Sequence, residues 1–354
     1  RMEAHSDHMY YRSEEEREDE ETSYRHSLNG LWKFHYARNY ASTVAGFEED
    51  AYSCKDWEDI YVPAHIQMEG YDVPQYANVQ YPWEGHEELH PGQIPERFNP
   101  VGSYVKYFHV PENMKGKRVF ISFQGAESGL ALWLNGTFVG YSEDSFTPSE
   151  FELTEYLKEG ENKLAAQVFK WTASSWCEDQ DFFRFSGIYR DVYLYTVPEV
   201  HVYDLKIRAI PDETLKKASL EIVTKTWGKG KLKLILSRKG EILLQDEKAL
   251  DGEDTCTWEI LNPLLWSAEE PNLYDLDMEV YDENGMLQEI IPEKVGFRRF
   301  EMKDGIMTLN GKRIVFKGVN RHEFSSVTGR HVSREELIQD IVTMKQNNIN
   351  AIRT

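Results

Sequence analysis

The densest group of side chains that could do chemistry occupies residues 178–181. It consists of three carboxylates and one amide in consecutive positions: Glu178, Asp179, Gln180 and Asp181. Oxygen ligands packed this closely can hold a hard cation or accept hydrogen bonds from sugar hydroxyls. A run of acidic residues is also common in solvated surface loops. The segment alone leaves both interpretations open.

A second candidate lies near the end of the sequence, after a short apolar run. Residues 314–319 read as a strand, and His322 follows within the polar stretch 320–323. If that strand is the first of a parallel barrel of alternating strands and helices, His322 lies at its carboxyl end, where such barrels form their active sites. Arg353, at the end of the next predicted strand, would lie on the same face. A lone histidine is more often structural, but this position favours a functional one.

The third candidate is Asn99, which begins the segment 99–102 in a polar loop. Its amide both donates and accepts hydrogen bonds, as a sugar hydroxyl does. A turn without any binding role is the simpler interpretation of this motif. The sequence contains no glycine-rich phosphate loop, no HExxH and no GxSxG, so no self-contained catalytic set accompanies the three candidates.

The elements that must position these groups read mainly as β-strands. After a highly charged arm at residues 10–26, strand-like runs recur between turn signals from residue 28 to about 198. The pair Asn135 and Gly136 between two such runs predicts a hairpin, because both residues tolerate positive φ. No long helical period interrupts these runs. Residues 1–198 are therefore predicted to form an N-terminal arm and a jelly-roll domain.

Two further regions follow. Residues 199–300 contain alternating strands at 220–224, 232–236 and 276–280, which indicates an immunoglobulin-like β-sandwich. Residues 301–354 contain a small hairpin, strand 314–319, a helix that begins with a capping box of Ser333 and Glu336, and strand 349–352. Strand, helix and strand make a βαβ unit, the repeat of a (β/α)8 barrel. One such unit has an open edge, so we expect a truncated barrel.

Composition narrows the class of protein. The 354 residues carry 40 Lys and Arg against 61 Asp and Glu, a formal net charge of −21. A surface this acidic repels phosphate backbones and anionic membranes, which argues against nucleic-acid and membrane partners. The three cysteines, Cys54, Cys177 and Cys256, are far apart and odd in number, which fits a reducing compartment. Without an apolar run of about 20 residues or a signal-peptide core, the sequence predicts a cytoplasmic protein.

With these features in place, the sequence resembles glycoside hydrolase family 2, and within it the large bacterial β-galactosidases of the lacZ type. The resemblance covers essentially the whole chain. Its motifs occur in order: SLNGLWKF at 27–34, VPAHIQMEGYD at 62–72, NPVGSY at 99–104, GYSEDS at 140–145, EDQDFFRFSGIYRDV at 178–192, LWSAEEPNLY at 265–274, GVNRHE at 318–323 and MKQNNINAIR at 344–353. Residues 178–181 favour a β-galactosidase over the glucuronidases and mannosidases of the family.

The resemblance implies a jelly-roll sugar-binding domain, an immunoglobulin-like domain and a (β/α)8 barrel, with a role for each candidate residue. Asn99 is similar to an asparagine that reaches the galactose from the first domain, and Asp181 to a carboxylate that binds Na+ and the sugar hydroxyls. His322 is similar to a barrel histidine that contacts the 3-hydroxyl region of galactose and stabilises the transition state. Arg353 matches a barrel arginine near the substrate. The resemblance also implies Mg2+, with ligands mostly beyond residue 354.

The implied reaction is retaining hydrolysis of terminal β-D-galactosides such as lactose by a two-glutamate double displacement. No glutamate in residues 1–354 matches the acid/base or the nucleophile, so we expect an N-terminal part of the enzyme that is inactive alone. The full-length form is expected to be a homo-oligomer. The alternatives are a non-catalytic carbohydrate-binding protein, or a β-glucuronidase or β-mannosidase of the same family.

Overall fold

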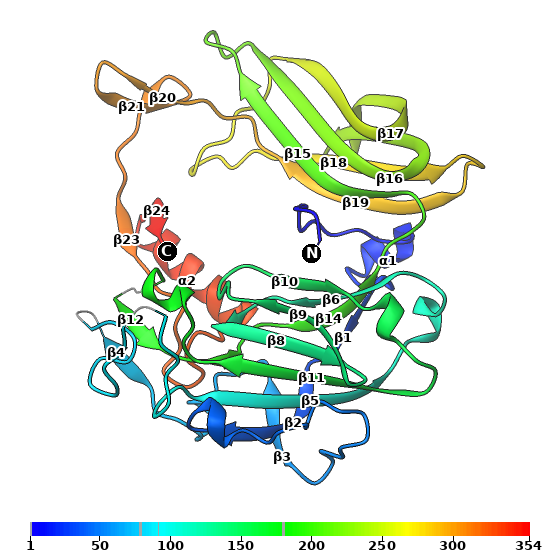
Figure 1. The fold of residues 1–354 in the computed structure, drawn as a ribbon. Helices are drawn as coiled ribbons and strands as arrows, with labels where there is room; N and C mark the ends of the chain where they lie inside the picture. Colours follow the sequence, from blue (N-terminus) through cyan, green and yellow to red (C-terminus); the bar gives the residue numbers. More distant parts are fainter. Residues whose placement is uncertain (1, 78–79, 91, 179–180) are drawn as a thin grey trace.

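The structure, a computed structural model, describes residues 2–77, 80–90, 92–178 and 181–354. It contains three regions (Figure 1). A β-sandwich holds most of the first 198 residues, and a second β-rich region lies over one of its sheets. The C-terminal segment leaves the second region and runs back to one end of the sandwich. The predicted mainly β class is confirmed.

The sandwich consists of two antiparallel sheets packed face to face. The smaller sheet has the order β1 (Arg25–Ser27), β14 (Val192–Thr196), β6 (Val119–Phe123) and β10 (Ser149–Glu152). The larger sheet has the order β3 (Glu58–Val62), β2 (Gly30–Ala37), β5 (Val101–His109), β11 (Glu161–Phe169), β8 (Gly129–Leu134) and β9 (Thr137–Ser142). Alternate side chains such as Leu164, Ala166 and Val168 of β11 are buried in one core between the sheets. This arrangement agrees with the predicted jelly roll.

Short connections hold the strands in register. Asn135 and Gly136 join β8 to β9 with φ values of 52° and 84°, the positive values that the hairpin prediction requires. The Asn135 amide also donates a hydrogen bond of 2.9 Å to the Tyr156 carbonyl, which ties the turn to a neighbouring loop. Other connections contain 3₁₀ helices: η1 (Tyr40–Ser42), η2 (Glu112–Met114), η3 (Thr154–Tyr156) and η4 (Ser174–Trp176).

Two short antiparallel pairs extend one end of the sandwich. They are β4 (Gln75–Ala77) with β12 (Phe182–Arg184), and β7 (Ala126–Glu127) with β13 (Gly187–Ile188). The backbone N–H groups of Ala64 and Ile66 donate to the carbonyls of Ile188 and Ser186, at 2.8 and 3.0 Å. These bonds place the predicted site segment at 181–188 beside residues 64–77, far from it in the sequence.

The N-terminal arm lies between the sandwich and the second region (Figure 1). Its helix α1 (Glu14–Glu18) begins after Ser13, whose hydroxyl accepts a hydrogen bond from the Glu16 N–H. Tyr10 and Tyr11 are buried, and Tyr11 exchanges backbone hydrogen bonds of 2.9 and 2.8 Å with Ile290 of the second region. The arm is therefore partly a packing element, a feature that its charged composition conceals.

The second region is built on long strands. They are β15 (His201–Pro211), β16 (Lys217–Arg238), β17 (Glu241–Leu261), β18 (Tyr274–Asp282) and β19 (Leu287–Val295). The strands expected at 220–224 and 232–236 are two halves of β16, which pair with β15 and β18 respectively. A register shift around Gly228, with φ 75°, separates the halves. Both contribute to one core, with Ile222 from the first half and Leu234 from the second.

The C-terminal segment contains the predicted βαβ unit. A small sheet of β20 (Phe300–Lys303), β21 (Ile306–Leu309) and β22 (Lys312–Arg313) comes first. The unit follows as β23 (Gly318–Asn320), α2 (Arg334–Gln346) and β24 (Ala351–Arg353), with β23 and β24 parallel. The predicted capping box of Ser333 and Glu336 is present. The strand predicted over 314–319 is wrong in extent, because β24 pairs only with residues 318–320.

Helix α2 buries none of its side chains, and its apolar residues Ile338, Ile341 and Val342 are exposed. Within the described ranges, no helix is long and apolar enough to cross a membrane.

Candidate functional site

Asp181 lies at the surface, directly before β12. Its Oδ1 accepts a hydrogen bond from the hydroxyl of Tyr76 on the paired strand β4. This bond stabilises the neutral phenol beside a carboxylate and raises the pKa of Tyr76. An exposed carboxylate next to a hydroxyl offers oxygen atoms to a cation or to sugar hydroxyls. Of the other members of the predicted cluster, Glu178 accepts a hydrogen bond of 3.0 Å from the Ser145 hydroxyl, and Asp179 and Gln180 lie outside the described residues.

Asn99 lies in the loop before β5 and is 8% exposed. Its Nδ2 donates to the Trp171 carbonyl at 2.9 Å, and its Oδ1 accepts from the Trp171 N–H at 3.0 Å. The amide therefore donates and accepts as predicted, but its partner is the protein's own backbone. Asn99 also lines a hollow of about 410 Å3 whose other walls are uncharged and largely aromatic. One N–H of the amide remains available for a further acceptor.

His322 and Arg353 lie at neighbouring strand ends. Asn320, the last residue of β23, pairs with Arg353 of β24, and the Arg321 N–H donates to the Arg353 carbonyl at 2.9 Å. His322 is exposed on the loop that follows. The Arg321 side chain is held by Asp340 of α2 through hydrogen bonds of 2.8 and 2.6 Å. The parallel strands β23 and β24 thus place His322 and Arg353 at the same end of their small sheet.

An aromatic contact brings the His322 loop to the Asp181 strand. The rings of Phe324 and Phe183 stack with their centroids 5.1 Å apart and an interplanar angle of 12°. Each phenylalanine stands two residues after the predicted site residue of its own segment. Among the described hydrogen bonds, those of Asn99 lead to Trp171 and Arg38 and not to this group. Three of the four predicted residues therefore belong to connected segments, and Asn99 lies apart.

Two charged residues that belong to no predicted site connect the His322 loop to another strand of the sandwich. Arg330, in the loop between β23 and α2, forms an ion pair with Glu127 of β7. The two side chains are only 12% and 8% exposed. A charged residue in a polar loop carries no sequence signal of burial, and this pair spans 203 positions. Reasoning from the sequence could not find it.

A second buried ion pair lies next to the Asn99 loop. The Lys170 Nζ is 2.6 Å from the Asp72 Oδ2, with side-chain exposures of 1% and 6%. Burial lowers the pKa of Lys170, and the Asp72 carboxylate partly opposes that shift. Gln67 donates to the same carboxylate at 3.0 Å, and the Lys170 N–H donates to the Pro100 carbonyl at 2.9 Å. This network fixes the residue that follows Asn99.

The described residues do not complete a metal site on their own. Within these ranges no three His, Cys, Asp or Glu side chains lie close enough to hold a metal ion. Asp181 and the Tyr76 hydroxyl supply two oxygen donors, whereas hard cations take about six. They fit part of a Na+ site, and no described group fits Mg2+.

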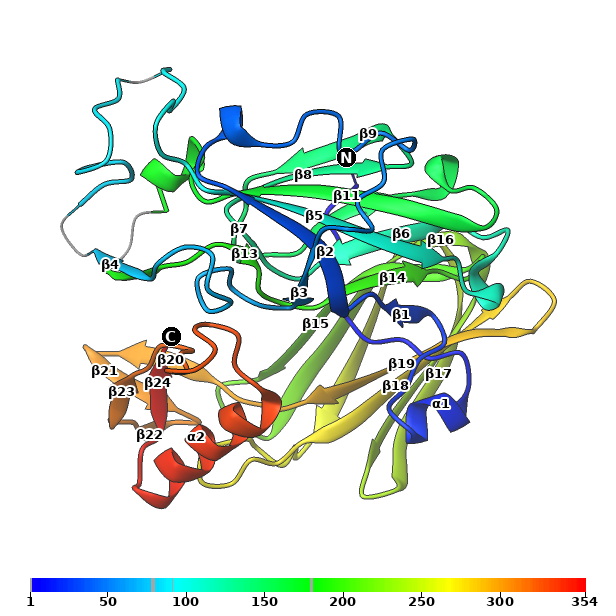
Figure 2. The same cartoon turned by 90° about the horizontal axis from the view of Figure 1, so that it is seen from below.

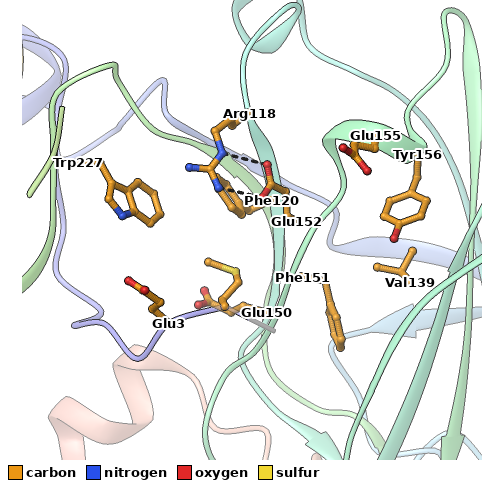
Figure 3. A pocket seen from close by; sticks show the side chains of 11 residues that line it. Glu3, Arg118, Phe120, Val139, Glu150, Phe151, Glu152, Glu155, Tyr156 and Trp227 are labelled. Atoms are coloured by element: carbon orange, nitrogen blue, oxygen red, sulfur yellow. Dashed lines mark hydrogen bonds and ion pairs between the residues drawn. The ribbon is translucent and has the colours of Figure 1, made fainter.

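A separate hollow of about 560 Å3 lies between the arm, the sandwich and the second region (Figure 3). None of the predicted site residues lines it. Arg118 reaches toward Glu152 and forms hydrogen bonds of 2.9 and 2.8 Å with it. Glu150 forms an ion pair of 2.6 Å with His5 of the arm. Because these carboxylates have cationic partners in the protein, we interpret the hollow as a joint between regions.

The fold and the site can now be compared with known proteins. Residues 25–198 match the family model "Glycosyl hydrolases family 2, sugar binding domain", and residues 300–354 match "Glycosyl hydrolases family 2, TIM barrel domain". Residues 200–298 between them match the model named "Glycosyl hydrolases family 2". The chain therefore belongs to glycosyl hydrolase family 2.

Within this family the chain is similar to proteins named β-galactosidase. It is 53% identical to one from Halalkalibacterium halodurans, which matches 100% of this chain over 36% of its own length. It is 50% identical to one from Streptococcus thermophilus, again over 100% of this chain and 35% of the relative. The β-galactosidase large subunit of Latilactobacillus sakei is 42% identical over 99% of this chain and 58% of that protein. The chain thus spans little more than a third of the first two relatives.

Solved structures share the fold. A β-glycosidase from Bacteroides vulgatus has a TM-score of 0.73 at 26% identity, over 93% of this chain and 41% of that one. A β-glucuronidase from Bifidobacterium dentium has a TM-score of 0.75 over 94% of this chain and 58% of that one. Its identity is 20%, so this likeness concerns the fold alone.

Proposed function

We propose that residues 1–354 form the N-terminal part of a retaining β-galactosidase, which hydrolyses terminal β-D-galactosides such as lactose. The observation that carries this proposal is the identity of 42–53% to proteins named β-galactosidase, extending over 99–100% of the chain. A substrate of this class is an uncharged polyol, which hydroxyl, carboxylate and amide groups can recognise by hydrogen bonds.

In the proposed enzyme, four residues of this chain bind and orient the sugar. Asn99 and Asp181 contribute from the sandwich, and His322 and Arg353 from the first two barrel strands. His322 stabilises the transition state by a hydrogen bond in the 3-hydroxyl region. No residue of 1–354 is assigned as acid/base or nucleophile, and both glutamates of the double displacement belong to later barrel strands. Bound Na+, held in part by Asp181, would attract sugar hydroxyl oxygens; Mg2+ is proposed with ligands mostly beyond residue 354.

The proposal is tested by assaying a protein that carries the complete barrel, and residues 1–354 alone. The substrates are chromogenic β-galactoside, β-glucuronide and β-mannoside. We expect the longer protein to hydrolyse the galactoside and residues 1–354 to hydrolyse none. Turnover by residues 1–354 without another chain, or a preference for the glucuronide or mannoside, would overturn the proposal. Galactoside binding without any turnover by the longer protein would support the carbohydrate-binding alternative.

The role of Asp181 has its own test. Asp181→Ala in the longer protein should reduce the dependence of activity on Na+ and weaken galactose inhibition by about 10-fold or more, as expected for a lost hydrogen bond to a charged group. Asp251→Ala is a matched control, because Asp251 pairs with Lys229 on the surface of the second region. An unchanged response to Na+ in Asp181→Ala contradicts the assignment.

We also propose a cytoplasmic homo-oligomer. The location is supported by three cysteines that form no disulfide. Light scattering of the longer protein tests the oligomeric state, and a monomer would refute it.

A further inference from the structure

Within its own segment, the loop that carries His322, residues 321–333, is held at its two ends, where Arg321 pairs with Asp340 of α2 and Ser333 caps that helix. The loop's internal bonds include a bridge between Ser325 and Gly329 and a hydrogen bond of 2.5 Å from the Thr328 hydroxyl to the His331 carbonyl. The helix that follows buries no side chain. Between these ends, the loop is held largely by contacts with the sandwich.

Arg330 supplies the main contact across this boundary. Its guanidinium pairs with the buried carboxylate of Glu127, and its Cζ lies 5.5–5.6 Å from the ring centroids of Phe146, Phe185 and Tyr189. All four partners belong to the sandwich. Burial lowers the pKa of Arg330 to about 9, so the group remains charged at neutral pH. An ion pair and cation–π contacts shielded from water are stronger than the same contacts on a surface.

The neighbouring residue, Gly329, fits closely against the same wall. Its φ is +69°, and a Cβ at this position would lie 2.8 Å from Cδ2 of His65 and 3.2 Å from the Phe185 ring. His65 is fully buried and stacks on Phe185 and Tyr189, with ring centroids 4.4 and 4.9 Å apart. Burial and the charge of Arg330 hold the pKa of His65 well below its usual value, so the wall is uncharged. The loop can approach this closely because residue 329 has no side chain.

We propose that Arg330, through Glu127 and this aromatic wall, is a positioning residue that fixes the His322 loop against the sandwich. The inference rests on the proposed function for its catalytic consequence. Among the described contacts, the loop is attached to the sandwich by Arg330, by the stack of Phe324 on Phe183, and by an ion pair of 4.0 Å between Glu323 and Arg190. Together these contacts fix the position of His322, in the C-terminal segment, relative to Asp181, in the sandwich. The enzyme thereby aligns two domains on one sugar through a contact that does not touch the substrate.

The first experiment measures amide hydrogen exchange in residues 1–354. Arg330→Met keeps the aliphatic stem and removes the charge, and we expect exchange in 321–333 to accelerate about 10-fold or more, because breaking a buried pair is strongly destabilising. Arg330→Lys should restore part of the protection, and Glu127→Gln should reproduce the loss. Arg298→Met is the matched control, since Arg298 lies over Trp266 at 4.9 Å and its described contact is with that ring and not with the loop. Unchanged exchange in 321–333 of Arg330→Met would overturn the inference.

The second experiment measures kcat/KM of the longer protein for a chromogenic β-galactoside and its 3-deoxy analogue. Arg330→Met should lower kcat/KM for the galactoside by about 10–100-fold, as expected for misplacement by about 1 Å. The penalty for removing the 3-hydroxyl should be smaller in Arg330→Met than in wild type, because the displaced His322 no longer uses that hydroxyl. A purely structural role would leave this ratio unchanged, and that result would refute positioning. If the wild-type protein hydrolyses no galactoside, the proposed function fails, while the exchange experiment still decides whether Arg330 holds the loop.

Discussion

Asp72 and Lys170 show how a buried charge depends on its partner. The two groups lie 2.6 Å apart and are almost wholly removed from solvent. Removing one member of such a pair leaves an uncompensated charge, which costs about 3–5 kcal/mol, whereas removing both is often nearly neutral. We expect Asp72→Ala to lower the free energy of unfolding of the sandwich by about 3 kcal/mol, and Lys170→Met in addition to recover part of it. Urea unfolding followed by tryptophan fluorescence measures both.

An exposed pair provides the comparison. Lys217 and Glu259 lie 3.1 Å apart on the second region, with side-chain exposures of 54% and 62%. Lys217→Ala should change the free energy of unfolding by less than about 1 kcal/mol, because solvent screens the pair. A loss in Asp72→Ala no larger than that in Lys217→Ala would contradict the role of the buried pair.

The predicted site residues differ in how far sequence could place them. His322 and Arg353 follow directly from the βαβ pattern, because residues after parallel strands gather at one edge. For Asn99, the amide chemistry was predictable but its partner, the Trp171 backbone, was not. Arg330 and Glu127 were missed because burial of a charge depends on what the fold places beside it.

At the scale of elements, the cap of α2 is a local feature with a measurable effect. Ser333 Oγ accepts a hydrogen bond from the Glu336 N–H, and the Glu336 carboxylate accepts one from the Ser333 N–H. Ser333→Ala should destabilise the helix by about 1 kcal/mol. Because α2 buries no side chain, tertiary packing does not mask this loss. Faster amide exchange in the first turn of α2 is the expected result, with Ser326→Ala in the preceding loop as control; equal exchange in both variants contradicts it.

The arm should respond to pH through His5. Its ring nitrogen Nε2 lies 2.6 Å from the Glu150 carboxylate, and the hydrogen bond to Glu150 is the main reason that its pKa rises to about 9. Because the folded-state pKa exceeds the usual value of about 6.5, this contact stabilises the fold fully below pH 6.5 and is lost as the pH rises through 9.

The variant His5→Gln tests this pH dependence. We expect His5→Gln to lower the free energy of unfolding by about 1 kcal/mol near pH 6.5, because the pair is partly solvated. At pH 10 the variant should lower it by almost nothing. Thermal unfolding of both proteins across this range measures the difference. A constant difference from pH 6.5 to pH 10 would show that the charge of His5 does not hold the arm.

Elements that depend on local sequence were the ones that could be predicted. The hairpin at Asn135 and Gly136 and the capping box of α2 are specified by neighbouring residues, and the structure confirms both. The length of β16 was not predictable, because a bulge at Gly228 joins two runs of the same alternation. The extent of β23 was not predictable either, since it depends on β24, about 30 residues later.

At the scale of the whole molecule, contacts between described residues of different regions hold those regions together. The arm lies between the sandwich and the second region, and residues of all three line the hollow of Figure 3. The ion pair of Arg330 with Glu127 joins the C-terminal segment to the sandwich, and Figure 2 shows that segment lying near β4. The site residues come from two of these regions, so their alignment depends on joints as well as on the rigidity of each domain.

The contact of Arg118 with Trp227 can be tested by a substitution that leaves the candidate site residues unchanged. Its guanidinium lies 4.8 Å from the ring centroid of Trp227 in the second region and 5.0 Å from that of Phe120 in the sandwich. Trp227→Ala removes the ring that faces the guanidinium and the aromatic area around it, which should free the two regions to move. We expect small-angle scattering of residues 1–354 to show a larger radius of gyration, and calorimetry to show separate transitions for the two regions.

The control separates loss of the joint from loss of stability in the second region. Trp258 packs against the core of that region. Trp258→Ala should therefore lower the second region's melting temperature and leave the radius of gyration unchanged. If Trp227→Ala scatters like the wild type and unfolds in step with it, the contact of Arg118 with Trp227 does not hold the two regions together. His5→Gln would then test whether the arm does.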